Sequence, residues 1–297
     1  MKNMEITLSR HAGFCGGVNR AYNMIRMAVA NPKVKKPIFV LGDLVHNKDV
    51  VENIGKLGVK KIEIPRKIED IFVDFTEEVG TLVITAHGMG PKIYELTKKN
   101  KIDLIDTTCP KVIKVQRLAK NFSNSKSPCQ LIVIGDRGHK EVEGICEWAG
   151  GKATVAENKN DLKNVKPDPL KKMAVISQTT QDKKNVDKIF EFIKEKYNKV
   201  EAVDTVCMAT QNRQNEARKL AENSDTVIII GSPTSANSTR LWEISSQINP
   251  KSHFIERAED IKKEWFKNCK KVGVTAGASS PDWVIKDVVK CLENLKK

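Results

Sequence analysis

The chain has 297 residues, of which 40% are hydrophobic, and this is enough to bury the cores of two domains or of several small α/β units. Its formal charge of +14, from 51 Lys and Arg against 37 Asp and Glu, favours anionic ligands or acidic partners. No apolar run approaches the length of a membrane span and the start lacks a signal-peptide pattern, so we expect a cytoplasmic protein with no membrane partner.

In chain order, three stretches place a single cysteine at the start of a predicted amphipathic helix. They are GFCGGVNRAYNMIRMA with Cys15, DTTCPKVIKVQRLAKNF with Cys109 and DTVCMATQNRQNEARKLA with Cys207, at spacings of 94 and 98 residues. The strand-like runs MEITL, IDLID and VEAVD lead into these cysteines. Such a near-period predicts three similar α/β units. We place them at residues 1–108, 109–206 and 207–297.

The same order of elements follows each cysteine. An apolar run ends in glycine at Gly42, Gly135 and Gly231, and these runs read as buried parallel strands. Polar side chains follow each glycine, 28 to 31 residues after the cysteine: His46, His139, and Ser235 with Asn237. A second apolar run ends 70 to 72 residues after the cysteine at further polar side chains: His87, Thr179 with its neighbour Thr180, and Ser279.

Ligands bind at the carboxyl ends of parallel strands, which is where these polar side chains are expected. Histidines, when protonated, and neutral donors such as Ser and Asn suit the oxygens of a phosphate group. Glu141, two residues after His139, is a candidate proton donor, with Thr179 or Thr180 as a relay. The alternative is a solvent-facing glutamate in a charged loop, which is what we expect for Glu143.

The third unit ends in the predicted helix DWVIKDVVKCLENL with no strand after it. We expect Glu5–Leu8 to supply the missing strand and to close the three units into a ring about a pseudo-threefold axis. The three repeated cysteines would then meet near this axis. They would hold zinc with an open position, form a cluster of inert thiols, or hold an iron–sulfur cluster with one free iron. The other cysteines have no repeated counterpart and are expected to be small buried hydrophobic residues: Cys129, Cys146, Cys269 and Cys291.

Several short motifs occur in order from Gly13 to Pro281: GFCGGVNRA, VHN, AHG, DTTCPKV, GHKEVEG, SQTT, CMATQNRQ, SANSTRL and GVTAGASSP. Together they resemble the LytB family, the 4-hydroxy-3-methylbut-2-enyl diphosphate reductases of the non-mevalonate isoprenoid pathway. The resemblance implies a [4Fe-4S] cluster at the pseudo-threefold centre, held by the three repeated cysteines, with an open iron for the allylic hydroxyl. Two electrons and two protons would remove this hydroxyl as water, giving isopentenyl and dimethylallyl diphosphate.

The resemblance also implies roles for single residues. Glu141 would be the acid, with Thr179 beside the substrate hydroxyl and His139 next to it. The diphosphate would be bound by His46, His87, His139, Ser235, Asn237 and Ser279. A ferredoxin or flavodoxin would donate the electrons, since the sequence contains no dinucleotide or flavin fingerprint.

Three positions depart from the family pattern. Ala236 stands where a second serine is usual, so backbone or water must replace one donor. Lys140 stands where proline is common, which we expect to loosen a loop that presents Glu141. Val206 replaces an isoleucine before the third cysteine, a change of one methylene.

Two other classes of function fit three cysteines. The first is an iron–sulfur sensor that binds nucleic acid through its basic surface, although the sequence has no helix-turn-helix or aromatic-rich strand. The second is a zinc hydrolase, which would be colourless and contain zinc rather than iron and sulfide. We expect the reductase, with no nucleic-acid partner.

Overall fold

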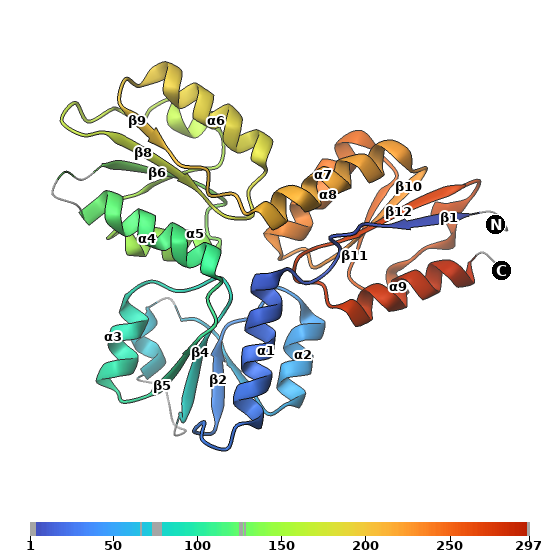
Figure 1. Ribbon diagram of the computed structural model, residues 1–297, viewed down its shortest axis with the longest axis horizontal. Coiled ribbons are helices and arrows are strands. Elements are labelled where there is room, and N and C mark those ends of the chain that lie inside the picture. The colour runs from blue at the N-terminus through green and yellow to red at the C-terminus, as the bar shows by residue number, and fades with distance from the viewer. Residues whose placement is uncertain (1–3, 66, 73–78, 125–126, 128, 296–297) are drawn as a thin grey trace. The chain divides into compact units, whose positions relative to one another are not determined.

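The computed structural model describes residues 4–65, 67–72, 79–124, 127 and 129–295, and Figure 1 draws its helices and strands. In these ranges the chain forms three four-stranded sheets, and the strand pairs in each of them are parallel. The predicted α/β class with parallel sheets is therefore confirmed.

The first sheet has the order β3-β2-β4-β5. Its strands are β2 (Ile38–Leu41), β3 (Lys60–Ile62), β4 (Thr81–Ile84) and β5 (Asp103–Asp106). The helices of this part of the chain are α1 (Gly16–Ala30), α2 (Lys48–Lys56), the short 3₁₀ helix η1 (Ile68–Phe72) and α3 (Lys92–Lys99).

The second sheet repeats this pattern with the order β7-β6-β8-β9. Its strands are β6 (Gln130–Ile134), β7 (Thr154–Ala156), β8 (Met173–Ser177) and β9 (Val200–Ala202). The accompanying helices are α4 (Pro110–Asn124), α5 (Lys140–Trp148), the 3₁₀ helix η2 (Lys159–Leu162) and α6 (Lys183–Lys196).

The third sheet has the order β1-β12-β10-β11 and takes one edge strand from the N-terminal part of the chain. Its strands are β1 (Glu5–Leu8), β10 (Thr226–Ile230), β11 (Ser252–Ile255) and β12 (Lys271–Ala276). The helices are α7 (Met208–Asn223), α8 (Ala236–Ile248), the 3₁₀ helices η3 (Ala258–Asp260) and η4 (Lys263–Phe266), and α9 (Asp282–Asn294). In β1, Glu5 pairs with Lys271, so the expectation that Glu5–Leu8 supplies the missing strand is confirmed.

The central strands are Ile- and Val-rich because a parallel sheet covered on both faces needs apolar side chains on both. In β10, Ile228 belongs to a core that includes Val288 of α9. Its neighbour Ile229 points to the opposite face, where it joins the core formed by Ala217 of α7 and Leu241 of α8. Period-2 alternation along one strand thus supplies two separate cores.

The chain divides into two compact units. Unit 1 comprises the N-terminal segment to Asn19, residues Val45–Val51 and Met208–Lys297, and contains the third sheet. Unit 2 comprises Arg20–Leu44 and Glu52–Cys207, and contains the first and second sheets.

Candidate functional site

The three repeated cysteines occupy the same local position. Cys15, Cys109 and Cys207 are each the residue before a helix, namely α1, α4 and α7, and each is a partly exposed thiol outside any disulfide. At Cys15 the sulfur accepts a weak hydrogen bond from the backbone N–H of Val18, at 3.5 Å. The positive end of a helix dipole favours negatively charged groups, so these positions suit thiolate ligands.

The backbone N–H of each of these cysteines donates a hydrogen bond to the turn that follows the neighbouring strand. The backbone N–H of Cys15 donates to the carbonyl of Ala278 at 3.2 Å, and that of Cys109 donates to Ala86 at 3.0 Å. The N–H of Cys207 donates to Thr179 at 2.9 Å. Each acceptor lies two residues after its strand, β12, β4 or β8, and that strand pairs with the one that leads to the cysteine. The repeat therefore extends to single hydrogen bonds.

Glu141 is a buried acid in unit 2. It lies in the first turn of α5 with 2% of its surface exposed, so the alternative of a solvent-facing glutamate is wrong. Its Oε1 accepts the backbone N–H of Thr179 at 2.7 Å, and its Oε2 accepts the Thr179 hydroxyl at 2.9 Å. Burial raises the pKa of Glu141 to about 7, although the two hydrogen bonds from Thr179 oppose this shift and the charge of Asp136 adds to it. A carboxyl with this pKa can donate or accept a proton near neutral pH.

His139 is the N-cap residue of α5. Its Nδ1 accepts the backbone N–H of Glu141 at 3.1 Å. Because a backbone N–H can only donate, Nδ1 carries no proton, and the proton of the neutral ring lies on Nε2. We expected the histidines to bind the anion in their protonated form. At this position the neutral ring of His139 can itself donate a hydrogen bond from Nε2. Gly138 precedes it with a φ of +79°, a conformation that glycine adopts without strain.

His87 lies beside His139, their ring centroids 5.7 Å apart in an edge-to-face arrangement. The next residue, Gly88, has a φ of +76°, and a Cβ there would come within 2.8 Å of the Thr108 side chain. Glycine is therefore required for the close approach of this turn to the residue before Cys109. The structure thus brings His87, His139, Glu141 and Thr179 into one group in unit 2.

The register assigns the two threonines of SQTT different places. Thr179 corresponds to Ala86 and Ala278, each two residues after its strand, and not to the residues that follow these alanines. Thr180 is the counterpart of His87 and Ser279, and its hydroxyl accepts a hydrogen bond from the side-chain amide of Gln178 at 2.9 Å. The threonine that contacts Glu141 is consequently Thr179, as the family resemblance implied, whereas the residue pattern by itself left Thr180 open.

Unit 1 brings together the remaining predicted donors. The Ser279 hydroxyl donates to the His46 carbonyl at 3.2 Å and lies 3.3 Å from the Ser235 hydroxyl. Ser235 is the N-cap of α8 and, like Ser279, is buried. Ser238 fixes it further, because its hydroxyl lies 3.1 Å from that of Ser235. Sequence reasoning missed Ser238, which stands two residues after Ala236 and keeps a second hydroxyl near the cap.

Asn237 occupies in the third repeat the place of Glu141 in the second, seven residues after the first central strand of its sheet. Its Oδ1 accepts the backbone N–H of Ala278 at 2.9 Å, as Glu141 accepts that of Thr179. The side chain is 4% exposed, and its Nδ2 is buried with no hydrogen-bond partner among the described residues. A buried unpaired donor costs about 1–3 kcal/mol, so this amide suits an acceptor supplied by a ligand.

Lys140 is the first residue of α5, so the predicted loop that presents Glu141 is a helical turn, and the expectation of a loosened loop is wrong. Proline is favoured at the first position of a helix, but lysine fits there and pairs with Glu143 at 2.9 Å. Glu143 is exposed, as expected. Val206 is buried in the core of the second sheet.

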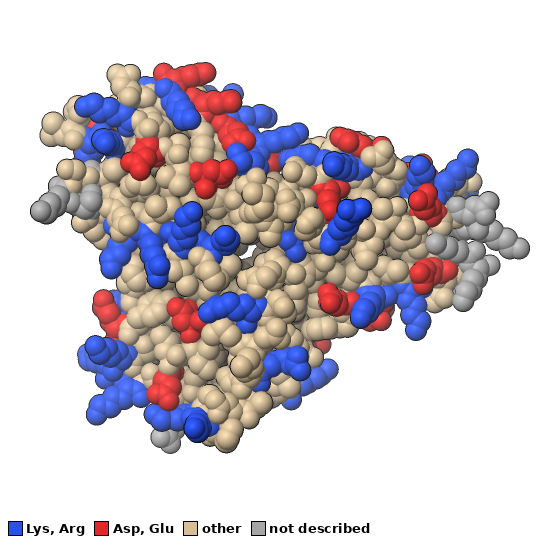
Figure 2. Space-filling model, in the orientation of Figure 1, with Lys and Arg blue, Asp and Glu red and all other residues tan. Residues whose placement is uncertain are grey.

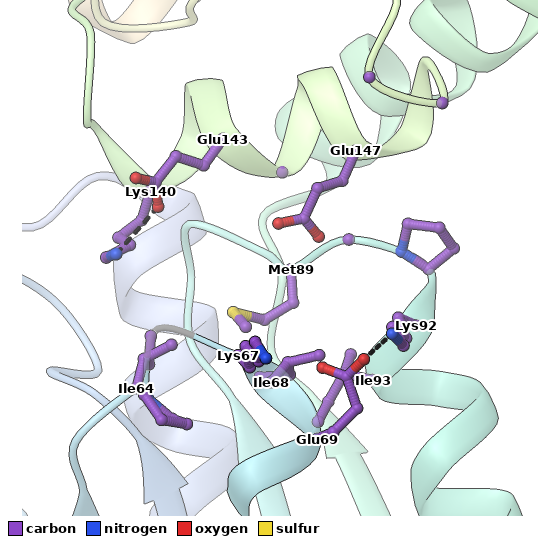
Figure 3. Close-up of a pocket in the computed structure, with 16 residues that line it drawn as sticks. Ile64, Lys67, Ile68, Glu69, Met89, Lys92, Ile93, Lys140, Glu143 and Glu147 are labelled. Atoms are coloured by element: carbon purple, nitrogen blue, oxygen red, sulfur yellow. Dashed lines mark hydrogen bonds and ion pairs between the residues drawn. The ribbon is translucent and has the colours of Figure 1, made fainter.

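A cavity of about 860 Å³ lies beside α5 in unit 2 (Figure 3). Glu147 points into it from α5, where Glu143 is turned toward Lys140, and Lys67, Glu69 and Lys92 lie on the opposite wall, where Glu69 and Lys92 form an ion pair. Its lining contains none of the predicted cysteine, histidine or hydroxyl site residues. The cavity is therefore separate from the Glu141 group, although both use α5.

The predicted site residues fall into one group per unit. Cys15 belongs to unit 1, and Cys109 and Cys207 belong to unit 2. Within the described ranges, no three His, Cys, Asp or Glu side chains are grouped so as to hold one metal ion. No helix in the same ranges is long and apolar enough to cross a membrane.

The four other cysteines behave as packing residues to different degrees. Cys269 is buried in the core of the third sheet, as expected. Cys129 and Cys146 are partly buried against the core formed by α4, α5 and their sheet. Burial raises the pKa of all three thiols, so they stay neutral. Cys291 is likewise partly exposed on α9, so the expected full burial is confirmed for Cys269 and wrong for Cys129, Cys146 and Cys291.

Comparison with known proteins agrees with the repeated geometry. The family model "LytB protein" matches residues 6–293. The 4-hydroxy-3-methylbut-2-enyl diphosphate reductase of Geotalea daltonii is 37% identical over 294 residues, 99% of either chain, and that of Wolbachia pipientis is 34% identical over 98% of this chain and 92% of its own.

Solved structures show the same likeness. The Plasmodium falciparum E-1-hydroxy-2-methyl-but-2-enyl-4-diphosphate reductase superposes with a TM-score of 0.88 at 30% identity, covering 98% of this chain and 89% of that one. A structure of (E)-4-hydroxy-3-methyl-but-2-enyl diphosphate reductase, described as the terminal enzyme of the non-mevalonate pathway, matches with a TM-score of 0.68 at 31% identity, over 98% and 99% of the chains. With a family model that covers nearly its whole length and relatives that share a third of its residues, the chain belongs to the LytB family.

Proposed function

We propose that the chain reduces 4-hydroxy-3-methylbut-2-enyl diphosphate. Two electrons and two protons remove the allylic hydroxyl as water and leave isopentenyl and dimethylallyl diphosphate. Family membership and full-length relatives named for this reaction support the proposal. The observation that carries it is the chain of contacts from the buried acid Glu141 through Thr179 to the backbone of Cys207.

We propose Cys15, Cys109 and Cys207 as the three ligands of a [4Fe-4S] cluster with one open iron. The donor set fits such a group, because all three are partly exposed thiols outside any disulfide and directly before helices, and thiolates are the ligands of iron–sulfur clusters. When bound, a cluster of this kind supplies electrons one at a time and a Lewis-acidic iron for the hydroxyl.

Glu141 and Thr179 are suited to move a proton to the leaving hydroxyl. Oε1 of Glu141 already accepts the Thr179 backbone N–H, so the acidic proton belongs on Oε2. The Oε2–H then donates to the Thr179 hydroxyl, which turns its own hydrogen away from the carboxyl. That hydrogen is free for the oxygen that leaves, and the pKa of about 7 leaves about half of Glu141 protonated at neutral pH and most of it protonated below.

The side chains proposed to bind the diphosphate are all hydrogen-bond donors. They are Ser235, Ser279 and the unpaired Nδ2 of Asn237, with His46 beside them, and also His87 and the Nε2–H of His139. Neutral donors of this kind bind phosphate oxygens without a counter-charge in the protein. Directed donors also fix the orientation of the allylic end.

The test is turnover by anaerobically purified protein with chemically reduced methyl viologen and the allylic diphosphate. We expect viologen oxidation and release of both five-carbon diphosphates. Cys109→Ser should lose iron and turnover, whereas Cys146→Ser, a matched thiol in the same unit, should keep both. No oxidation by protein with a full iron and sulfide content would contradict the proposal and favour a sensor. Colourless protein that contains zinc would favour a zinc hydrolase.

A further inference from the structure

Helix α4 carries four cationic side chains and no acidic one. Lys111, Lys114, Arg117 and Lys120 are all exposed, and the helix contains neither Asp nor Glu. In the part of the chain that the structure describes, none of the four forms an ion pair, and Lys120 lies 5.3 Å from the Trp148 ring centre. Figure 2 shows blue side chains where Figure 1 draws α4, with no red among them. The charge on this face is therefore uncompensated.

A shallow groove of about 330 Å³ runs along the same helix. Its lining repeats at helical spacing, so it lies on one face of α4: Pro110, Ile113, Lys114, Arg117, Leu118 and Asn121. The side chains between them, such as Val112 and Val115, are buried in the opposite direction. The outer face thus combines an apolar strip with a cationic rim, which is the usual anatomy of a protein docking surface.

We propose that this α4 groove is where an acidic ferredoxin docks to deliver electrons. The inference rests on the proposed function, which needs an external reductant. Two reduced ferredoxins each give one electron, and these two electrons with two protons break the C–O bond and release water. Both ferredoxins leave oxidised, so electrons and atoms balance.

The position of the groove along the chain supports this role. It begins at Pro110, the residue directly after the proposed ligand Cys109. At a rise of about 1.5 Å per residue, Arg117 lies about 12 Å from Cys109 along the helix axis. A carrier seated here would be close to the metal ligand, while the cations would raise the rate of encounter with an acidic partner.

Helix α6 is a suitable control because it belongs to the same unit and is also lysine-rich. Its cations are interspersed with acids, and Lys183 pairs with Asp187. Lys188 and Lys194 are exposed on it, as Lys114 and Arg117 are on α4. A double reversal on either helix changes the net charge by the same amount.

The experiment compares Lys114→Glu/Arg117→Glu with Lys188→Glu/Lys194→Glu in the anaerobic full chain that carries its cluster. Each is assayed with reduced ferredoxin and, separately, with reduced methyl viologen. We expect the α4 variant to lose at least about 10-fold in kcat/KM for ferredoxin, with weaker salt dependence, and to stay within twofold of wild type with viologen. The α6 variant should stay within about twofold in both assays.

The outcomes separate the docking site from the function. Equal losses in both variants, or none in the α4 variant, would overturn the α4 site. Loss of nucleic-acid binding with unchanged ferredoxin turnover would assign the face to nucleic acid instead. A wild-type chain with an intact cluster that turns over with neither reductant would overturn the proposed function itself, and the docking inference with it.

Discussion

The second and third repeats place different side chains at one backbone position. Glu141 and Asn237 both lie near the start of a helix, and both accept a backbone N–H from the turn after the adjacent central strand of the sheet, β8 or β12. Glu141 also holds the Thr179 hydroxyl, whereas Asn237 has Ala278 at that position and keeps an unpaired amide. One framework thus provides a titratable acid in one repeat and a neutral donor in the other, so the repeat sets the geometry and the side chain sets the chemistry.

The largest effect on the rate should come from replacing Glu141, the acid of the second repeat. In Glu141→Gln the amide oxygen keeps the contact with the Thr179 N–H, but the amide has no acidic proton to transfer. We expect kcat to fall by about 10²–10⁴, while KM changes little. Steady-state turnover with viologen measures this. Glu143→Gln, an exposed change on the same helix, should stay within about twofold, and a similar loss there would refute the role of Glu141.

A carboxylate in the third repeat should have the next largest effect. Asn237→Asp keeps the acceptor for the Ala278 N–H but replaces the unpaired donor with a negative charge, which would repel the diphosphate that we propose it binds. We expect KM to rise by about 10–100-fold, because hydrogen bonds to charged groups are worth about 1.5–3 kcal/mol, with a smaller change in kcat. An unchanged KM would show that this amide does not contact the substrate.

The pH dependence should distinguish the two repeats. In the proposed reaction Glu141 acts in its protonated form with a pKa of about 7, so kcat/KM should fall about tenfold per pH unit above pH 7. Glutamine does not titrate, so Glu141→Gln should lose this alkaline limb altogether. Asn237, its counterpart in the third repeat, does not titrate either and contributes no limb. Rates from pH 5.5 to 9 test this, and a limb that survives in Glu141→Gln would assign it to another group.

The free energy of unfolding should also depend on pH through the protonation of Glu141. The folded chain keeps the Glu141 proton to about pH 7, whereas an exposed glutamate loses it near pH 4.5. The stability gained by keeping it protonated is therefore complete below pH 4.5 and is lost as the pH rises to 7 and above, about 3 kcal/mol in all. Thermal unfolding of Glu141→Gln should lack this dependence, and parallel curves for variant and wild type would contradict the assignment.

The smallest effect should come from the relay. Thr179→Val keeps the backbone N–H and removes a hydroxyl that lowers the pKa of Glu141. We expect a loss of about tenfold in kcat and a shift of the alkaline limb to higher pH. Thr179→Ser should restore both, and rate loss without the shift would mean that the hydroxyl does not touch the carboxyl.

Much of the fold could be predicted because its signals are local. The buried strands before Gly42, Gly135 and Gly231, and the return of Glu5–Leu8 to the third sheet, are visible as apolar runs at a regular spacing. The fourth strands β3, β7 and β11 were missed. They are short edge strands that need pairing on one side alone, so their sequences lack a long apolar run.

The candidate site could be predicted as residue types but not as contacts. The spacing indicated His139 and Glu141, yet the capping bond that leaves the His139 proton on Nε2 depends on where α5 begins. Likewise, the choice of Thr179 over Thr180 needs the exact strand end, and local patterns place such ends to within a few residues. The correspondence of Glu141 with Asn237 is visible once both turns have coordinates.

The unpaired amide of Asn237 makes ligand binding and folding of unit 1 parts of one equilibrium. In the ligand-free folded chain, the Nδ2 donor is buried away from water and has no acceptor among the described residues. Its desolvation therefore lowers the free energy of unfolding. A phosphate oxygen that satisfies the amide removes the cost in the folded state and leaves the unfolded chain unchanged. Inorganic diphosphate should therefore raise the melting temperature even of protein stripped of iron, by thermodynamic linkage alone.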